Sequence, residues 1–240
     1  VRIGGDYQGK GTVPNALRTV VSGNSVINAD ALLNGNGGRV IVWADQVTGF
    51  YGNISARGGL NFGNGGFVEV SGKENLSFQG RVNLGANNGN LGTLLLDPEN
   101  ITIVGAARGP GGFSDDNQLN NNTPAGQEAG EIRSGDDRID RTVNFTLSDR
   151  VLNAQTGNVT LEATNDITIE NGLSLNFGNV STPTTITFKA NADGIGGGDF
   201  VMDQAQSITA LGRNVTISGV NVTLGKIDTG DSLSRNAGNV

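Results

Sequence analysis

GNGGRVIVW at residues 35–43 and GNGGFVEVS at residues 63–71 begin with the same tetrapeptide and continue as a short apolar strand. A looser copy, NGNLGTLLLDP, occupies residues 88–98. The glycines that end the three turns, Gly38, Gly66 and Gly92, are separated by 28 and 26 residues. A glycine-asparagine turn followed by a strand at a near-constant interval is typical of a repeat architecture.

Each repeat unit holds about three short strands, each too short to form a stable hairpin alone. We therefore expect each strand to pair with the equivalent strands of the neighbouring units, which would bury the apolar side chains in a continuous column. This predicts an all-β chain in the form of a parallel β-helix. An antiparallel sandwich also has short strands and turns. The coil is favoured because the turn sequences recur in three related copies.

Residues 105–141 interrupt this pattern, since they contain clusters of Gly, Pro and Asn and few apolar residues. They predict a long irregular excursion near the middle of the chain, or a joint between two β-helix segments at 1–104 and 142–240. Beyond it, apolar residues alternate with Thr, Ser and Asn, which indicates strands with one face inside and one in water. Weak helical patterns occur only at 15–21 and 147–154.

The composition of the chain excludes several classes of function. Its formal net charge is −7 and it has no basic stripe, so we expect no nucleic-acid partner. No run of 18 apolar residues could span a membrane. The absence of Cys and His removes disulfides, thiolate metal sites and the most common general base. The 39 Gly and 30 Asn among 240 residues predict many tight turns.

The repeat segments carry a family resemblance. The matching text is IGGDYQG at 3–9, GGRVIVWAD at 37–45, GFVEVSGK at 66–73 and GTLLLDP at 92–98, with a more generic match at 158–167. In these segments the chain resembles the filamentous-haemagglutinin-like exoproteins of bacterial two-partner secretion, and most nearly their cyanobacterial members.

The resemblance implies a right-handed parallel β-helix that is exported through an outer-membrane transporter to the cell surface or the medium. It implies adhesion as the commonest role, with host or neighbouring-cell glycans or surface proteins as ligands. It implies no catalytic site. The Asn-Pro-Asn motifs of the family's secretion domain are absent and the sequence opens within a strand, so we expect an internal segment of a longer protein. The predicted function is a structural shaft.

Two glycine-rich stretches are only partial matches to ligand-binding loops. Residues 4–10 approach a phosphate-binding loop, but Gly11 stands where Ser or Thr would hold Mg²⁺. Residues 194–199 resemble one copy of a calcium-binding repeat, with the wrong spacing and no second copy. Both are predicted to be turns. We expect no metal-binding and no cofactor-binding residue.

The alternative function is a carbohydrate-active β-helix enzyme, either a lyase or a hydrolase. Such enzymes need paired carboxylates for acid-base chemistry, and acidic residues cluster at 115–116 and at 136–140. A groove with three or more converging Asp or Glu side chains and a Lys or Arg would support this alternative. Outward residues limited to Thr, Ser and Asn would argue against it. We expect no residue of the chain to be catalytic.

The remaining candidates have structural interpretations. Asp97-Pro98 predicts a corner after a strand, and Trp43 and Tyr51 are expected to fill corners of the stack, although a surface pair could contact sugar rings. Asn-x-Ser/Thr sequences arise wherever a turn asparagine precedes an alternating strand, and glycosylation at them is the less favoured reading. The asparagines concerned are Asn53, Asn75, Asn100, Asn121, Asn144, Asn158, Asn179, Asn214 and Asn221.

Overall fold

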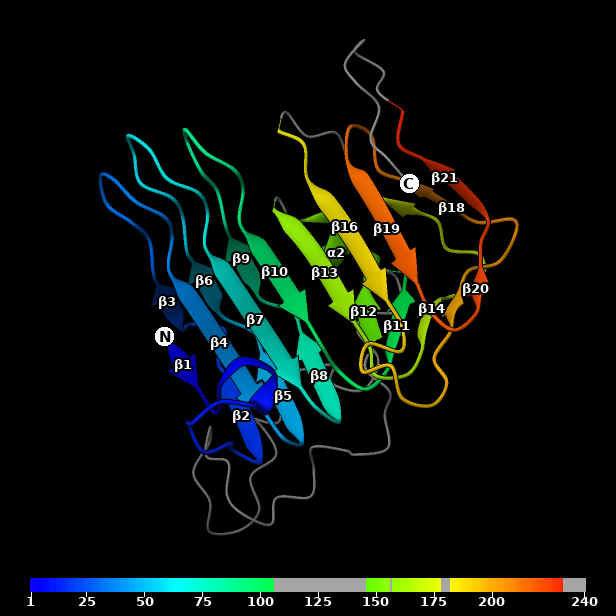
Figure 1. The fold of residues 1–240 in the computed structure, drawn as a ribbon, viewed down its shortest axis with the longest axis horizontal. Coiled ribbons are helices and arrows are strands. Elements are labelled where there is room, and N and C mark those ends of the chain that lie inside the picture. The colour runs from blue at the N-terminus through cyan, green and yellow to red at the C-terminus, as the bar shows by residue number, and fades with distance from the viewer. Residues whose placement is uncertain (106–145, 156, 178–181, 231–240) are drawn as a thin grey trace.

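The structure, a computed structural model, describes residues 1–105, 146–155, 157–177 and 182–230 (Figure 1). Within these residues the chain is nearly all-β, and every strand pairing is parallel. The antiparallel sandwich is therefore wrong. The predicted excursion at 105–141 lies outside the described residues except for Gly105.

One long parallel sheet, called the main sheet below, runs through the described chain. Its strands, in spatial order, are β1 (Arg2–Ile3), β4 (Arg39–Ala44), β7 (Phe67–Gly72), β10 (Thr93–Leu96), β13 (Asn158–Glu162), β16 (Thr185–Lys189) and β19 (Asn214–Ser218). The predicted repeat is confirmed, because Arg39 pairs with Phe67 and Phe67 pairs with Thr93.

Shorter sheets hold the strands that follow each strand of the main sheet. The second side of the stack contains β2 (Arg18–Val21), β5 (Val47–Phe50) and β8 (Asn75–Phe78), then β12 (Thr146–Ser148), β11 (Ile101–Val104), β14 (Ile167–Ile169), β17 (Phe200–Val201) and β20 (Val222–Thr223). The third side contains β3 (Val26–Asn28), β6 (Asn53–Ser55) and β9 (Arg81–Asn83), then β15 (Leu175–Asn176), β18 (Ser207–Thr209) and β21 (Lys226–Asp228).

The chain visits these sides in turn and then returns to the main sheet one strand further along (Figure 1). Each strand therefore finds its partners about one repeat before and one repeat after it in sequence. The parallel sheets are compatible with a parallel β-helix. This connectivity explains why strands of only two to six residues suffice: their apolar side chains are buried by the equivalent strands above and below.

In the main sheet, the last strand before residues 106–145 pairs directly with the first main-sheet strand after them. Strand β13 pairs with β10 in register, so that Leu95 faces Thr160 although 65 residues separate them. On the second side, β12 adds a strand beside β11. The short helix α2 (Asp149–Asn153) follows β12 and is capped by the Ser148 side chain, which accepts a hydrogen bond from the Arg150 N–H. Of the two weak helical patterns, 147–154 contains this helix, whereas 15–21 contains strand β2.

Alternate strand residues point into a continuous apolar core. Val40, Val42, Val68 and Val70 are all fully buried there. Phenylalanines are stacked at successive levels, with ring centroids of Phe50 and Phe78 5.5 Å apart. Five phenylalanines lie in this core, where aromatic rings bury a large area; they are Phe50, Phe78, Phe177, Phe188 and Phe200.

The Gly-Asn turns of the repeats stack closely on one another. Asn36 Oδ1 accepts a hydrogen bond from the Asn64 N–H, and Asn64 Oδ1 accepts one from the Asn90 N–H, each at 2.8 Å. Gly63 has φ +131°, and a Cβ there would collide with the carbonyl oxygen of Gly35. The asparagines of the turns thus form a ladder of hydrogen-bonded amide side chains, whereas the position of Gly63 has no room for a side chain.

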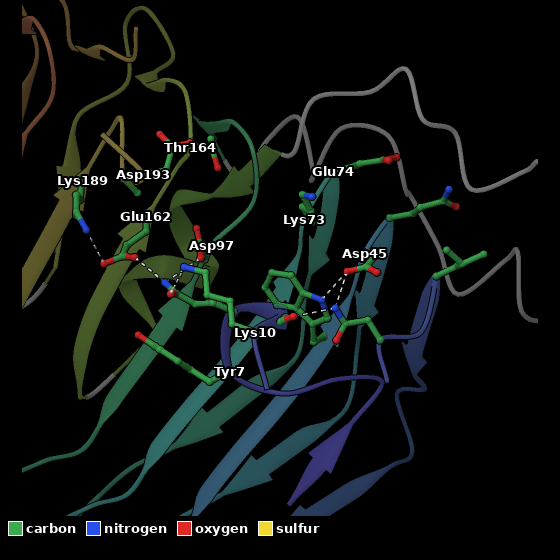
Figure 2. Close-up of a pocket in the computed structure, with 17 residues that line it drawn as sticks. Tyr7, Lys10, Asp45, Lys73, Glu74, Asp97, Glu162, Thr164, Lys189 and Asp193 are labelled. Carbon is green, nitrogen blue, oxygen red and sulfur yellow. Dashed lines mark hydrogen bonds and ion pairs between the residues drawn. The ribbon is translucent and has the colours of Figure 1, made fainter. Parts of the chain in front are cut away.

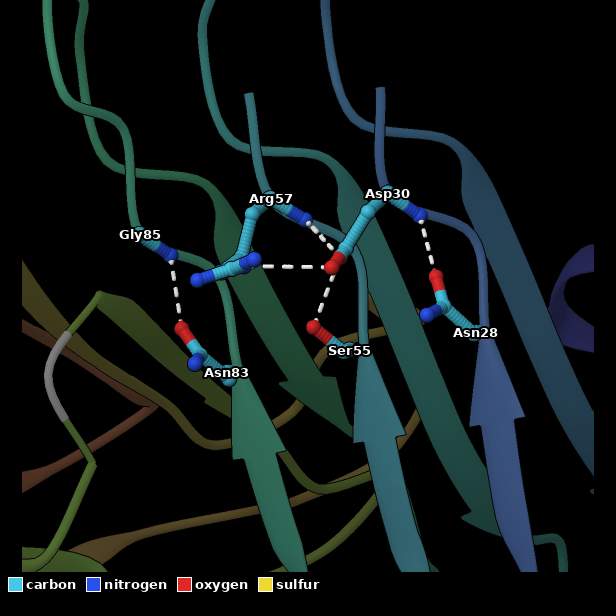
Figure 3. Close-up of polar contacts among 6 residues, drawn as sticks. All are labelled: Asn28, Asp30, Ser55, Arg57, Asn83 and Gly85. Carbon is cyan, nitrogen blue, oxygen red and sulfur yellow. Dashed lines mark hydrogen bonds and ion pairs between the residues drawn. The ribbon is translucent and has the colours of Figure 1, made fainter. Parts of the chain in front are cut away.

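A second polar ladder lies where the third side turns back to the main sheet (Figure 3). Asn28, Ser55 and Asn83 occupy one register position on β3, β6 and β9. Asp30 links two levels, since it accepts hydrogen bonds from the Ser55 hydroxyl at 2.6 Å and from the Arg57 N–H at 2.7 Å. Burial opposes ionisation of Asp30, but these hydrogen bonds and the Arg57 guanidinium outweigh it and hold the pKa of Asp30 below its ordinary value.

Candidate functional site

The segment between β1 and β2 lies across the outward face of the main sheet, and we call residues 4–16 the N-terminal strap. It contains a single 3₁₀ turn, η1 (Tyr7–Gly9). Its glycines lie against the indole of Trp43: a Cβ at Gly9 would be 2.8 Å from the ring, and one at Gly5 would be 2.6 Å from it. Gly9 also has φ +63°, which glycine adopts most readily. Glycine at these positions therefore allows the strap to lie flat on the indole.

The strap buries side chains that the strand pleat directs away from the core. Ile41 is 1% exposed and Leu95 is 3% exposed, although both alternate with core residues. Glu69, which lies between them in register, is fully buried. Nothing in the sequence analysis indicated a cover over β4, β7 and β10, so this layer is a feature that the sequence did not predict.

Gln8 of the strap brings three carboxylates together. Its backbone N–H donates to Glu69 Oε1 at 3.1 Å and to Oε2 at 3.3 Å. Its side-chain Nε2 donates to Asp97 Oδ2 at 3.3 Å and to Glu162 Oε2 at 3.2 Å, so those two oxygens are no more than 6.5 Å apart. The carboxylates come from β7, from the end of β10 and from β13, three neighbouring strands of the main sheet.

The surroundings of Glu69 and Asp97 favour the protonated forms of these two carboxyl groups. Burial raises the pKa of Glu69 to about 7, and the negative charge of Asp97 acts in the same direction. The hydrogen bond from the Gln8 N–H and the positive charge of Arg39 lower this pKa, but they do not outweigh burial. Burial also raises the pKa of Asp97 to about 6, with the charge of Glu162 adding to it. Near neutral pH, Glu69 is thus poised between a neutral and a charged state.

Two lysines lie beside this cluster. Lys10 Nζ donates to the Gln8 side-chain oxygen at 3.2 Å. Lys189 Nζ lies 3.5 Å from Glu162 Oε1, because the two residues are paired in register on β16 and β13. The cluster therefore combines acceptors of hydrogen bonds with cationic donors, and Gln8 supplies both an amide donor and an amide acceptor.

Asp97 and Glu162 border an open groove on the outward face of the main sheet, with a volume of about 900 Å³ (Figure 2). We call it the outer groove. The strap forms one wall of it, and the segment after β16 contributes Asp193. Most of the lining residues are polar or charged, although apolar atoms make up nearly half of the lining surface. The lining consists of Tyr7, Gln8, Gly9, Lys10, Asn15, Leu17, Trp43, Asp45, Gln46, Lys73, Glu74, Asp97, Glu162, Thr164, Lys189, Ala192 and Asp193.

Within the described ranges, no group of three or more His, Cys, Asp or Glu side chains is arranged to hold a metal ion. The same residues include no helix that is long and apolar enough to cross a membrane.

The two glycine-rich stretches are turns. Residues 4–10 belong to the strap, and the next strand or helix along the chain is strand β2, whereas a phosphate-binding loop would lead into a helix. Residues 194–199 connect β16 to β17, with Gly194 and Gly196 at positive φ. Asp199 Oδ1 accepts hydrogen bonds from the Asn221 backbone and side chain, which joins neighbouring levels.

The other sequence candidates have separate outcomes. The acidic residues at 115–116 and 136–140 lie outside the described residues, so they cannot be placed near the groove. Asp97 does end a strand before a buried proline, as expected of a corner, but its side chain also accepts a hydrogen bond from the strap. Trp43 is buried beneath the strap and is 4% exposed, so it cannot stack on a sugar ring together with Tyr51.

Several of the candidate glycosylation asparagines serve as structural hydrogen-bonding groups. Asn158 Oδ1 accepts a hydrogen bond from the Thr185 N–H at 2.8 Å, and its Nδ2 donates to the Leu91 carbonyl at 3.2 Å. Asn75 is buried. A glycan on either side-chain nitrogen would require the local packing to open.

Comparison of the chain with protein-family models and with curated proteins found no match in either set. The functional interpretation therefore depends on the geometry of the chain itself and on the resemblance of its repeat segments.

Sequence reasoning missed the cluster of Gln8, Glu69, Asp97 and Glu162. The available signal was the presence of single acidic residues in apolar strands, at FVEVS and at NVTLE. An isolated glutamate on an outward strand position is ordinarily solvated. Only the strap and the direct pairing of β10 with β13 bring these residues together.

Proposed function

We propose that the chain is a structural segment of a secreted or cell-surface, adhesin-like protein, folded as a right-handed parallel β-helix with no catalysis of its own. The observation that carries this proposal is the in-register main sheet of parallel strands, with the chain returning to it after each circuit of the other sides. Such a stack transmits position along its axis through backbone hydrogen bonds and core packing, which is the requirement for a shaft.

The resemblance to two-partner-secretion exoproteins supports a location at the cell surface or in the medium. Under this proposal the protein reaches the exterior through an outer-membrane transporter, which recognises a part of the parent protein beyond these residues. Ligands would then be glycans or surface proteins of host or neighbouring cells. The acidic net charge of −7 argues against nucleic acid as a ligand.

Surface labelling tests this proposal. Antibodies raised against residues 1–240 should label intact cells of the organism that encodes the chain, and mild protease treatment of those cells should remove the signal. A cytoplasmic protein serves as the control that intact cells exclude antibody. Labelling that appears only after the cells are lysed would contradict the proposal.

The carbohydrate-active enzyme is the second candidate, because Asp97 and Glu162 lie close together in the outer groove beside Lys10 and Lys189, with the buried Glu69 bonded to the same Gln8. The position of Gln8 argues for binding without cleavage. Its Nε2 lies between Asp97 Oδ2 and Glu162 Oε2, where a scissile glycosidic oxygen would have to lie. Release of new reducing ends by the parent chain, but not by Asp97→Asn, would favour the enzyme over the shaft.

A further inference from the structure

We infer that the outer groove binds an extended, neutral polysaccharide chain that lies along the stacking axis of the main sheet. This goes beyond the structural role, and it gives the carbohydrate-active alternative a class of ligand. It requires no cleavage of the bound chain. The argument depends on the length of the groove, its chemistry and the kind of backbone that it could accommodate.

The groove is elongated along the stack. Its lining includes residues from, or just after, five successive strands of the main sheet: Asp45 after β4, Lys73 after β7, Asp97 after β10, Glu162 of β13 and Lys189 of β16. At about 4.8 Å per strand, four steps span roughly 19 Å. A ligand that contacts all five levels is therefore a chain and not a single small molecule.

The chemistry of the lining fits a ligand rich in hydroxyl groups. Carboxylates accept hydrogen bonds, lysines donate them, and the amides of Gln8, Asn15 and Gln46 can do both. A sugar hydroxyl is also both donor and acceptor, so it can bond to any of these groups. Apolar side chains such as Leu17 and Ala192 also line the groove, but a lipid tail or an apolar peptide is a poor fit because it would cover the eight charged side chains of the lining without bonding to them.

The charge of the lining favours a neutral polysaccharide over an anionic one. Five carboxylates line the groove against three lysines; these residues are Asp45, Glu74, Asp97, Glu162, Asp193, Lys10, Lys73 and Lys189. Uronate or sulfate groups would meet a net negative surface, which disfavours their binding.

A peptide strand is a poorer match for the floor of the groove. Peptides that bind sheets do so by adding a strand at an exposed edge. Here the floor is the face of the main sheet, and the backbone groups of β7, β10 and β13 are engaged with neighbouring strands on both sides. Only side chains at intervals of about 4.8 Å are offered, whereas an extended peptide repeats every 3.3 Å or so.

Affinity gel electrophoresis of the 240-residue chain tests the inference. Gels contain dextran, mannan, xylan or a soluble β-1,4-glucan, with alginate and polygalacturonate as anionic comparators. We expect retardation by at least one neutral polymer. Triple substitution of the exposed lining residues Lys10→Ala, Lys73→Ala and Asp193→Ala should weaken that retardation at least tenfold.

Two further variants keep the test decisive. Thr164→Trp should obstruct the groove while leaving its charge unchanged, and should also abolish retardation. Arg81→Ala removes an exposed cation on β9, on a different side of the stack, and should bind as the parent does. Far-ultraviolet circular dichroism and thermal melts confirm that each variant is folded.

The outcomes separate the proposals. Retardation without new reducing ends supports the groove as a binding site and leaves the enzyme candidate without support. No retardation by any neutral polymer, retardation by the anionic polymers alone, or equal binding by the groove variants and the parent would each overturn the inference. None of these results depends on whether the chain is found at the cell surface.

Discussion

The two halves of the main sheet share one register but present different outward faces. One ladder of outward side chains runs Ile41, Glu69, Leu95 and then Thr160, Thr187 and Thr216 along successive strands. The first three are buried beneath the strap, whereas the threonines are partly or fully exposed. The same strand position is therefore apolar where a second layer covers it and hydroxylated where water reaches it.

This contrast shows that the residue types on the outward face of a parallel sheet depend on whether a second layer covers that face. It also makes Glu69 exceptional, because it is a carboxylate within the covered, apolar part of the ladder. The strap compensates with a backbone hydrogen bond from Gln8, and the raised pKa shows that this compensation is incomplete.

The largest expected effect comes from removing a covered outward side chain. Leu95→Ala should lower the free energy of unfolding by about 2–4 kcal/mol, because it leaves a cavity beneath the strap. Thr160→Ala, its partner in register on the uncovered side, should change stability by no more than about 0.5 kcal/mol. Urea titrations of both variants measure the difference, and equal losses would mean that the strap does not cover Leu95 in solution.

The next prediction concerns Glu69 and pH. Because its folded-state pKa of about 7 lies above the ordinary 4.5, its contribution to stability is fully present below about pH 4.5 and is lost as the pH rises through 7. The raised pKa corresponds to at most about 3 kcal/mol. Asp97 acts in the same direction at lower pH, as its pKa is about 6.

Glu69→Gln should therefore flatten the decline in stability between about pH 4.5 and pH 7, since the amide carries no charge and its oxygen can still accept from the Gln8 N–H. Urea midpoints at intervals of half a pH unit provide the measurement. A parent chain whose stability rises over this range, or a variant with the same slope as the parent, would be evidence against a buried Glu69.

A smaller effect is expected at the contact between the strap and Trp43. Gly9→Ala places a methyl group against the indole at positive φ and should cost about 1–2 kcal/mol. Because the chain has one tryptophan, a red shift of its fluorescence would report the lifting of the strap. Gly197→Ala, where an added Cβ meets nothing within 4 Å, is the matched control and should leave the emission unchanged.

The smallest effect is expected at the polar ladder of the third side. Asp30→Asn should cost about 1 kcal/mol or less, because the Arg57 side chain with which Asp30 pairs is 56% exposed. Since the pKa of Asp30 is lowered, its contribution is present above the ordinary 3.8 and is lost as the pH falls below that value. The variant should accordingly differ from the parent at pH 6 and converge with it near pH 2.

The sequence predicted the repeat well and the site poorly, for physical reasons. The turns at 35–38 and 63–66 specify the stacking, because Asn36 and Asn64 bond to the next level and Gly63 admits no side chain. The pairing of β10 with β13 was hidden by a 65-residue interval, in which the near-constant period is lost. The strap was interpreted as a turn because its glycines show only that the chain bends, and not what it lies against.

The most direct test of the account is a cross-link between levels on either side of the 106–145 interval. Thr102 of β11 and Thr168 of β14 are paired in register, and the chain contains no native cysteine. Paired parallel strands lie about 4.8 Å apart, within the range that a disulfide spans. Thr102→Cys/Thr168→Cys should form an intramolecular disulfide under mild oxidation and melt at a higher temperature than its reduced form. Failure to form it, while a Thr160→Cys/Thr187→Cys control forms readily, would contradict a continuous stack.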